Sequence, residues 1–279
     1  MATRLQPTAK HLTVNGLDLR YLEWGRPSAL PVICVHGYTS SAEAFNAMAR
    51  QLQDRAHIIA MDVRGHGGSG WSPEGAYGYA DQARDLAALI DRLGIDRFVL
   101  IGTSMGGVIS MVYASQHADR LRGLVLNDIG PDVEAGSGRI TGLVRSRPED
   151  FASLEEAMQY RRQTSPITAA RPPEDQRETA RGVLPDARWA WKMDPAYIEQ
   201  RIARGPPVRP PLWPVLETLP CPTLVIWGTD SDVLSEAQAK RMAAALPKGE
   251  LVAVPGVGHA PTLVEPPILA ALDRLLATV

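Results

Sequence analysis

The sequence of 279 residues has little of several features that mark special classes of protein. Its two cysteines, Cys34 and Cys221, are too few for a disulfide framework. Each stands in or beside an apolar run, so we expect both to be packed core residues. No stretch reaches the ~18 apolar residues of a membrane helix, and residues 1–12 lack the apolar run of a signal peptide. We therefore expect a soluble, cytoplasmic protein.

The sequence also lacks an excess of charge of either sign. Lys and Arg total 29 and Asp and Glu total 31, so the net charge is −2. This balance gives no electrostatic reason to expect nucleic acid or a membrane surface as a partner. Hydrophobic residues at 45% and charged residues at 22% are ordinary for globular proteins and exclude wholesale disorder.

Short apolar runs alternate with segments of helical periodicity over most of the chain. The alternating pattern of residues 11–24 around Asn15-Gly16 predicts a β-hairpin. The later runs are continuous, as in strands buried on both faces of a parallel sheet; they comprise residues 31–35, 57–61, 98–101, 124–126, 223–227 and 251–254. Helical periodicity falls at residues 41–53, 80–93, 105–118, 235–246 and 264–277. This alternation predicts an α/β protein with right-handed crossovers.

The alternation stops between about residues 130 and 213. This stretch holds eleven of the 23 prolines and twelve arginines, with helical patches near 149–163 and 174–182 and no clear strand. Its aromatic residues, among them Trp189, Trp191 and Trp213, argue against a disordered linker. We expect an ordered insertion that lies over the sheet. Because an equal number of acidic residues matches its arginines, its composition does not predict an anionic substrate.

The pattern G-x-S-x-G occurs at Gly102-Thr103-Ser104-Met105-Gly106, between an apolar run and a helical segment. In a strand–turn–helix context this pattern is typical of a nucleophile elbow. The glycines permit a sharp turn there, and the serine hydroxyl stands exposed at the end of the strand. The sequence therefore predicts Ser104 as a catalytic nucleophile.

A serine nucleophile needs a general base, because its free hydroxyl is weakly nucleophilic near neutral pH. Among six histidines, His259 follows the last apolar run, in a loop where parallel sheets build their sites. We therefore predict His259 as the base. Structural roles are expected for the other five histidines, which are His11, His36, His57, His66 and His117.

These motifs together resemble the α/β-hydrolase superfamily. The resemblance rests on His36-Gly37, the turn at residues 62–69 (Asp-x-Arg-Gly-His-Gly-x-Ser), the elbow and Gly258-His259, and it covers essentially the whole chain. It implies a mostly parallel eight-stranded sheet flanked by helices, formed by residues 1–129 and 214–279. A helical cap, residues 130–213, is then inserted after the sixth strand. The resemblance also implies an oxyanion hole formed by the backbone N–H groups of Tyr38 and Met105.

The acid of the triad has three candidates. The family usually places it three residues past the glycine of the seventh strand, which here is Ser231, flanked by Asp230 and Asp232. A subgroup with an Asp-Ile-small-Pro sequence and a serine after the seventh strand, which this chain resembles, uses an acid after the sixth strand, which here is Asp128. We favour Asp128 over Asp232, and Asp232 over Asp230. The alternative for Asp128 is that it only caps the first turn of the insertion.

The resemblance implies a serine hydrolase that cleaves a small-molecule carboxylic ester through an acyl-enzyme, without a cofactor. No His/Cys cluster has zinc spacing and no Gly-rich loop ends in Lys-Ser/Thr, so neither a metal nor a nucleotide site is predicted. Lactonases, C–C bond hydrolases and cofactor-free perhydrolases use the same triad, and a non-enzymatic receptor can share the fold. An intact triad argues against a receptor. Dehalogenase and epoxide hydrolase chemistry is disfavoured because both use an aspartate where this chain has Ser104.

Overall fold

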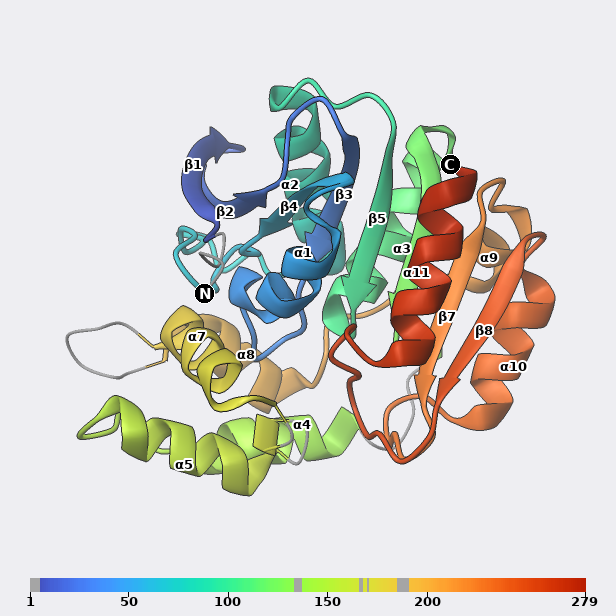
Figure 1. The fold of residues 1–279 in the computed structure, drawn as a ribbon. Coiled ribbons are helices and arrows are strands. Elements are labelled where there is room, and N and C mark those ends of the chain that lie inside the picture. Colours follow the sequence, from blue (N-terminus) through green and yellow to red (C-terminus); the bar gives the residue numbers. More distant parts are fainter. Residues whose placement is uncertain (1–5, 133–136, 166–167, 170, 185–190) are drawn as a thin grey trace, which may run out of the picture.

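The computed structural model describes residues 6–132, 137–165, 168–169, 171–184 and 191–279, and its centre is one eight-stranded sheet (Figure 1). The strand order is β1-β2-β4-β3-β5-β6-β7-β8; β2 pairs antiparallel with both neighbours, and all other pairs are parallel. The predicted α/β fold with its mostly parallel sheet is thereby confirmed. The strands are β1 Thr8–Val14, β2 Leu17–Trp24, β3 Leu30–Val35, β4 Ala56–Met61, β5 Phe98–Thr103, β6 Leu121–Asn127, β7 Thr223–Gly228 and β8 Gly249–Val254.

The hairpin between β1 and β2 forms at the predicted turn. Asn15 and Gly16 have φ angles of 49° and 77°. A two-residue type I′ turn needs positive φ at both positions, and Asn-Gly adopts it at low cost.

Helices cover both faces of the sheet. One face packs against α1 (Asn46–Leu52) and α11 (Pro266–Thr278), and the other against α2 (Tyr79–Arg92), α3 (Met105–His117), α9 (Trp213–Thr218) and α10 (Glu236–Ala245). Successive residues of β3 alternate between the two cores, as Val32 and Cys34 join the first and Ile33 the second. Both cysteines are buried and free. Within the described ranges, no helix is long and apolar enough to cross a membrane.

The chain between β6 and α9 forms further helices, α4 (Ser137–Ser146), α5 (Leu154–Thr164), α7 (Pro173–Val183) and α8 (Pro195–Arg204). Figure 1 shows α4, α5 and α7 together beyond the end of the sheet to which β5 points. The predicted helical patches correspond to α5 and α7, whereas α4 and α8 were not expected. Trp189 lies outside the described residues. The domain boundaries at residues 130 and 213 stay a prediction.

Polar and aromatic contacts attach these helices to the sheet domain. Arg50 of α1 pairs with Asp175 at 2.5 Å and with Glu178 at 2.9 Å, both on α7. Tyr197 of α8 stacks on Tyr77, with ring centroids 4.4 Å apart and planes inclined by 8°. The helices therefore hold a defined position over the carboxyl ends of the parallel strands.

Candidate active site

Ser104 stands at a strained turn between β5 and α3. Its backbone has φ 51° and ψ −116°, a region that non-glycine residues rarely adopt. A Cβ atom on Gly106 would lie 2.0 Å from the Val35 carbonyl oxygen, and one on Gly102 would lie 2.5 Å from the Gly106 carbonyl oxygen. Both glycines are therefore required for the close approach of β3, β5 and α3. This packing presents the serine side chain at the end of the sheet.

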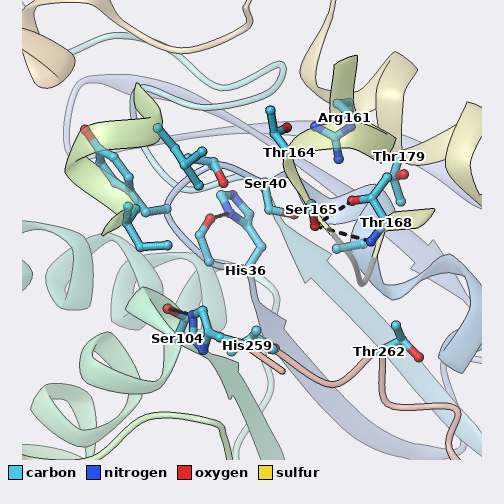
Figure 2. A pocket seen from close by; sticks show the side chains of 18 of the residues that line it. His36, Ser40, Ser104, Arg161, Thr164, Ser165, Thr168, Thr179, His259 and Thr262 are labelled. Carbon is cyan, nitrogen blue, oxygen red and sulfur yellow. Dashed lines mark hydrogen bonds between the residues drawn. The ribbon is translucent and has the colours of Figure 1, made fainter. Parts of the chain in front are cut away.

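Three side chains from distant parts of the chain form one line of hydrogen bonds. His259, in the loop after β8, has its Nε2 atom 2.8 Å from Ser104 Oγ and its Nδ1 atom 2.8 Å from Asp128 Oδ2. Figure 2 shows Ser104 and His259 directed toward each other. The Asp128 side chain is fully buried and that of His259 is 7% exposed. The structure thus brings together the predicted nucleophile, the predicted base and the favoured acid.

Asp128 is held by partners beyond the histidine. The Gly228 N–H donates to its Oδ1 atom at 3.1 Å, and the Ser231 hydroxyl donates to its Oδ2 atom at 2.7 Å. Ser231 Oγ in turn accepts from the N–H groups of Val233 and Leu234. Ser231, which occupies the family's usual acid position, therefore donates a hydrogen bond to the carboxylate of Asp128, which directly follows the neighbouring strand β6. The serine after the seventh strand was a mark of the subgroup that this chain resembles, but its hydrogen bond to Asp128 was not predicted.

The other two candidate acids do not contact His259. Asp232 is exposed and forms a two-pronged ion pair with Arg139 of α4, which lowers the pKa of the Asp232 carboxyl. Asp230 is exposed and accepts a hydrogen bond from the Thr229 hydroxyl at 3.2 Å. The geometry therefore favours Asp128 over both.

The loop after β3 lies directly against the nucleophile. A Cβ atom on Gly37 would stand 3.4 Å from Ser104 Cβ. The His36 Nδ1–H donates to the Gly37 carbonyl at 2.8 Å, while its Nε2 accepts from the Val63 N–H at 3.0 Å. The Gly37–Tyr38 peptide bond is trans, so the Tyr38 N–H points in the opposite direction to the Gly37 carbonyl, which accepts the hydrogen bond from His36. Among the described residues, no hydrogen bond uses the Tyr38 or Met105 N–H, so both are available to an oxyanion.

Two buried histidines brace this loop in their neutral forms. Burial lowers the pKa of His36 to about 4 and the pKa of His66 to about 3. The His66 Nε2–H donates to the Tyr38 carbonyl at 2.5 Å. These contacts are structural, since neither ring reaches Ser104.

Asn127, at the end of β6, is a further residue that sequence reasoning missed. Its fully buried amide donates to the Pro261 carbonyl at 2.9 Å and to the Thr103 hydroxyl at 3.1 Å. The backbone carbonyl of Asn127 accepts a hydrogen bond from the Ser104 N–H at 3.0 Å. Asn127 therefore ties the serine turn to the histidine loop.

A cavity of about 230 Å³ opens above Ser104 and His259. Its walls come from the loop after β3, the histidine loop and the helices α4, α5 and α7, as Figure 2 shows in part. Within the described part of the chain, no group of three or more His, Cys, Asp or Glu side chains is arranged to hold a metal ion. The expectation of a cofactor-free reaction stays a prediction.

Comparisons with known proteins agree with this architecture. A family model described as alpha/beta hydrolase fold matches residues 31–266. A relative from Cupriavidus necator, named 3-hydroxybutyrate-oligomer hydrolase, is 32% identical over 268 residues, covering 90% of each chain. A relative from Mesorhizobium japonicum, named 2-(acetamidomethylene)succinate hydrolase, is 29% identical over 264 residues, covering 93% of this chain and 91% of the relative.

A solved structure of an alpha/beta hydrolase from Novosphingobium aromaticivorans is similar to the whole molecule. It has a TM-score of 0.87 and 32% sequence identity, covering 98% of this chain and 99% of that chain. Sequence and fold thus agree along nearly the full length, and the chain belongs to the alpha/beta hydrolase family and is a hydrolase.

Proposed function

We propose that this hydrolase cleaves carboxylic esters by a Ser-His-Asp acyl-enzyme mechanism. The observation that carries the proposal is the line of hydrogen bonds from Asp128 through His259 to Ser104, with both distances 2.8 Å. When His259 Nδ1–H donates to Asp128, Nε2 is left with a lone pair for the proton of the Ser104 hydroxyl. This is the tautomer that a general base needs.

In the first half of the reaction, Ser104 Oγ bonds to the ester carbonyl carbon while its proton passes to His259 Nε2. The Tyr38 and Met105 N–H groups donate to the oxyanion, each stabilising it by about 3 kcal/mol. His259 then gives the proton to the departing alcohol, and the acyl group remains on Ser104. In the second half, His259 takes a proton from a water molecule whose oxygen attacks the acyl carbon. The bond from that carbon to Ser104 Oγ then breaks, His259 returns the proton to Ser104 Oγ, and the acid leaves. Asp128 stays ionised and orients the imidazole.

The relative named 3-hydroxybutyrate-oligomer hydrolase supports an ester as the substrate. Such an oligomer consists of hydroxy acid units joined by ester bonds. Ser104 also supports it, because a serine that forms an acyl-enzyme suits a substrate with a carbonyl carbon. We therefore place esters before lactones and before C–C bond cleavage on the same triad.

The test is turnover of p-nitrophenyl esters of increasing acyl length, alongside lactones, with Ser104→Ala as the diagnostic variant. Loss of a triad nucleophile costs about a million-fold in kcat, because the three residues act as a unit. A fluorophosphonate should label the wild-type protein at Ser104 and leave the variant unlabelled. The matched control is Ser115→Ala, on α3 outside the cavity, which should keep full activity.

Two results would contradict the proposal. One is a folded Ser104→Ala protein that retains more than a few per cent of wild-type turnover. The other is a labelled wild-type protein that hydrolyses no ester but cleaves a vinylogous diketone, which would move the assignment to C–C bond hydrolysis.

A further inference from the structure

The cavity wall carries an excess of positive charge. Four arginines line the cavity, and among its described lining residues there is no aspartate or glutamate. Arg139 is neutralised by its ion pair with Asp232. Within the described ranges, the other three, Arg147, Arg161 and Arg171, have no ion-pair partner. The equal numbers of arginines and acidic residues in residues 130–213 therefore do not reveal this uneven arrangement in space.

Arg161 of α5 is the clearest case. Its Nε atom is buried and has no hydrogen-bond partner among the described residues. Burial, together with the nearby charge of Arg171, lowers the pKa of its guanidinium to about 10. Its sequence neighbour Arg162 instead pairs with Glu155 at 2.8 Å, outside the cavity. A charged group with a buried donor that has neither a hydrogen-bond partner nor a counterion among the described residues is unfavourable. A bound anion would therefore stabilise Arg161.

Arg171 has carboxylates nearby, but both are engaged elsewhere. Asp175 pairs with Arg50 at 2.5 Å. Glu265 accepts hydrogen bonds from the backbone N–H groups of Thr262 at 2.8 Å and Val264 at 3.1 Å. Burial lowers the pKa of Arg171 as well. Among the described residues neither carboxylate forms an ion pair with Arg171, so its guanidinium can still pair with a ligand in the cavity.

Hydroxyl side chains lie beside Arg161. Figure 2 shows Arg161 beside Thr164, Ser165, Thr168 and Thr179, on the far side of the cavity from Ser104 and His259. The Thr168 hydroxyl donates to Ser165 Oγ at 3.1 Å. One hydroxyl proton of this Ser165–Thr168 pair is then left without an acceptor among the described residues. The Thr164 and Thr179 hydroxyls donate to backbone carbonyls of their own helices. The wall thus offers guanidinium donors and one hydroxyl donor together, which suits an oxygen anion.

We propose that Arg161 and Arg171 form a carboxylate subsite, which binds a free carboxylate of the substrate while its ester group lies at Ser104. For the ester, this inference rests on the proposed function. The planar guanidinium fork matches the two oxygens of a carboxylate. A cavity of about 230 Å³ suits a short substrate with its ester and its carboxylate at opposite ends. The carboxylate can belong to the acyl part or to the alcohol part.

Binding tests the subsite independently of catalysis. Ser104→Ala protein is titrated calorimetrically with glutarate, dimethyl glutarate and inorganic phosphate. Glutarate should bind, and dimethyl glutarate should bind at least tenfold more weakly. Arg161→Gln and Arg171→Gln, each added to Ser104→Ala, should weaken glutarate binding by about ten- to a hundredfold, the usual contribution of a hydrogen bond to a charged group. Arg162→Gln is the matched control and should leave binding unchanged.

Kinetics then tests where the carboxylate lies. Wild-type kcat/KM is compared for two pairs of esters: monomethyl against dimethyl glutarate, and 3-acetoxypropionate against its methyl ester. The anion of at least one pair should be preferred about tenfold or more, mainly through KM. Arg161→Gln should remove that preference, and Arg162→Gln should keep it. The pair of esters in which the anion is preferred shows whether the substrate carries its carboxylate on the acyl part or on the alcohol part.

Three outcomes would overturn the subsite. Glutarate could fail to bind, could bind equally well to folded Arg161→Gln and Arg171→Gln proteins, or could bind more weakly than phosphate at the same arginines. The two arginine variants keep the test decisive if one of them does not fold. Glutarate binding that depends on Arg161, in a wild-type protein that hydrolyses no ester, would support the subsite and overturn the esterase.

Discussion

At the scale of single residues, the surroundings of each carboxylate separate the candidate acids. Asp128 is fully buried and receives hydrogen bonds from Gly228, Ser231 and His259. Asp232 faces solvent and pairs with Arg139. A buried carboxylate with several donors has a fixed orientation, whereas an exposed ion pair contributes little. Asp128 is therefore suited to hold an imidazole in one tautomer.

We expect Asp128→Asn to lower kcat by three or more orders of magnitude at neutral pH. An amide in place of the triad carboxylate favours the wrong tautomer of the histidine and costs about ten-thousand-fold in serine proteases. The measurement is kcat with the best ester of the panel.

Asp232→Asn and Asp230→Asn are the matched controls and should each lose less than about tenfold, since neither side chain contacts His259. A larger loss in Asp232→Asn than in Asp128→Asn would move the acid to the loop after β7. Equal and modest losses would mean that two carboxylates share the role.

At the scale of elements, the serine turn depends on how closely α3 approaches β3. The space next to Gly106 is occupied by backbone atoms of Val35, which cannot rotate away as a side chain would. Gly142, in the middle of α4, has nothing within 4 Å of its Cβ position. The two helical glycines thus provide a direct comparison.

Gly106→Ala should lower the free energy of unfolding by about 3 kcal/mol or more, because the new methyl group overlaps a rigid backbone. It should also lower activity, since the clash displaces Ser104. Gly142→Ala should instead raise the free energy of unfolding by about 0.5–1 kcal/mol, the usual gain of alanine over glycine in a helix. Urea denaturation measures both. A neutral Gly106→Ala variant would contradict the close packing at the turn.

At the scale of the whole molecule, the parallel sheet collects the site from four separate strand ends. The loops after β3, β5, β6 and β8 hold the proposed site residues Tyr38, Ser104, Asp128 and His259, and the loop after β7 adds Ser231. Burial within this assembly also makes the fold sensitive to acid. His36 and His66 are kept neutral in the folded state and are protonated more readily when the chain unfolds.

Stability should therefore fall as the pH drops from about 6.5 toward 4. In this window the unfolded chain binds a proton at His36 that the folded chain does not, so the free energy of unfolding falls by about 1.4 kcal/mol per pH unit for that group. The contribution of His36 to the free energy of unfolding is fully present above pH 6.5, the ordinary pKa of histidine. It is lost by about pH 4, where His36 titrates in the folded state. His66 acts in the same direction down to about pH 3.

Urea denaturation at several pH values between 7.5 and 4.5 measures this slope. In His36→Asn, whatever its absolute stability, the pH dependence should shrink because one proton uptake has been removed. An unchanged slope in that variant would show that His36 is not the group responsible.

The sequence by itself determined the elements and the residues whose signals are local. Continuous apolar runs placed the buried strands, Asn15-Gly16 placed the hairpin turn, and G-x-S-x-G between a strand and a helix marked Ser104. These features can be predicted from the sequence because strand burial, turn geometry and the elbow each depend on a few neighbouring residues. The helix α8 carried a local signal too, an Asp194 cap before Pro195, although no helix was expected there.

The tertiary structure alone decided which distant side chains meet. The family resemblance favoured Asp128, but residue type alone does not separate it from Asp230 and Asp232. The pairing of β6 with β7 is what places Asp128 against Ser231 and His259. Likewise, equal numbers of acids and arginines in the insertion did not indicate that Arg161 lines the cavity with no counterion among the described residues. Arg162 beside it pairs with Glu155. Composition counts charges over a whole segment, whereas electrostatic energy depends on distance and burial, which are set only when the chain has folded.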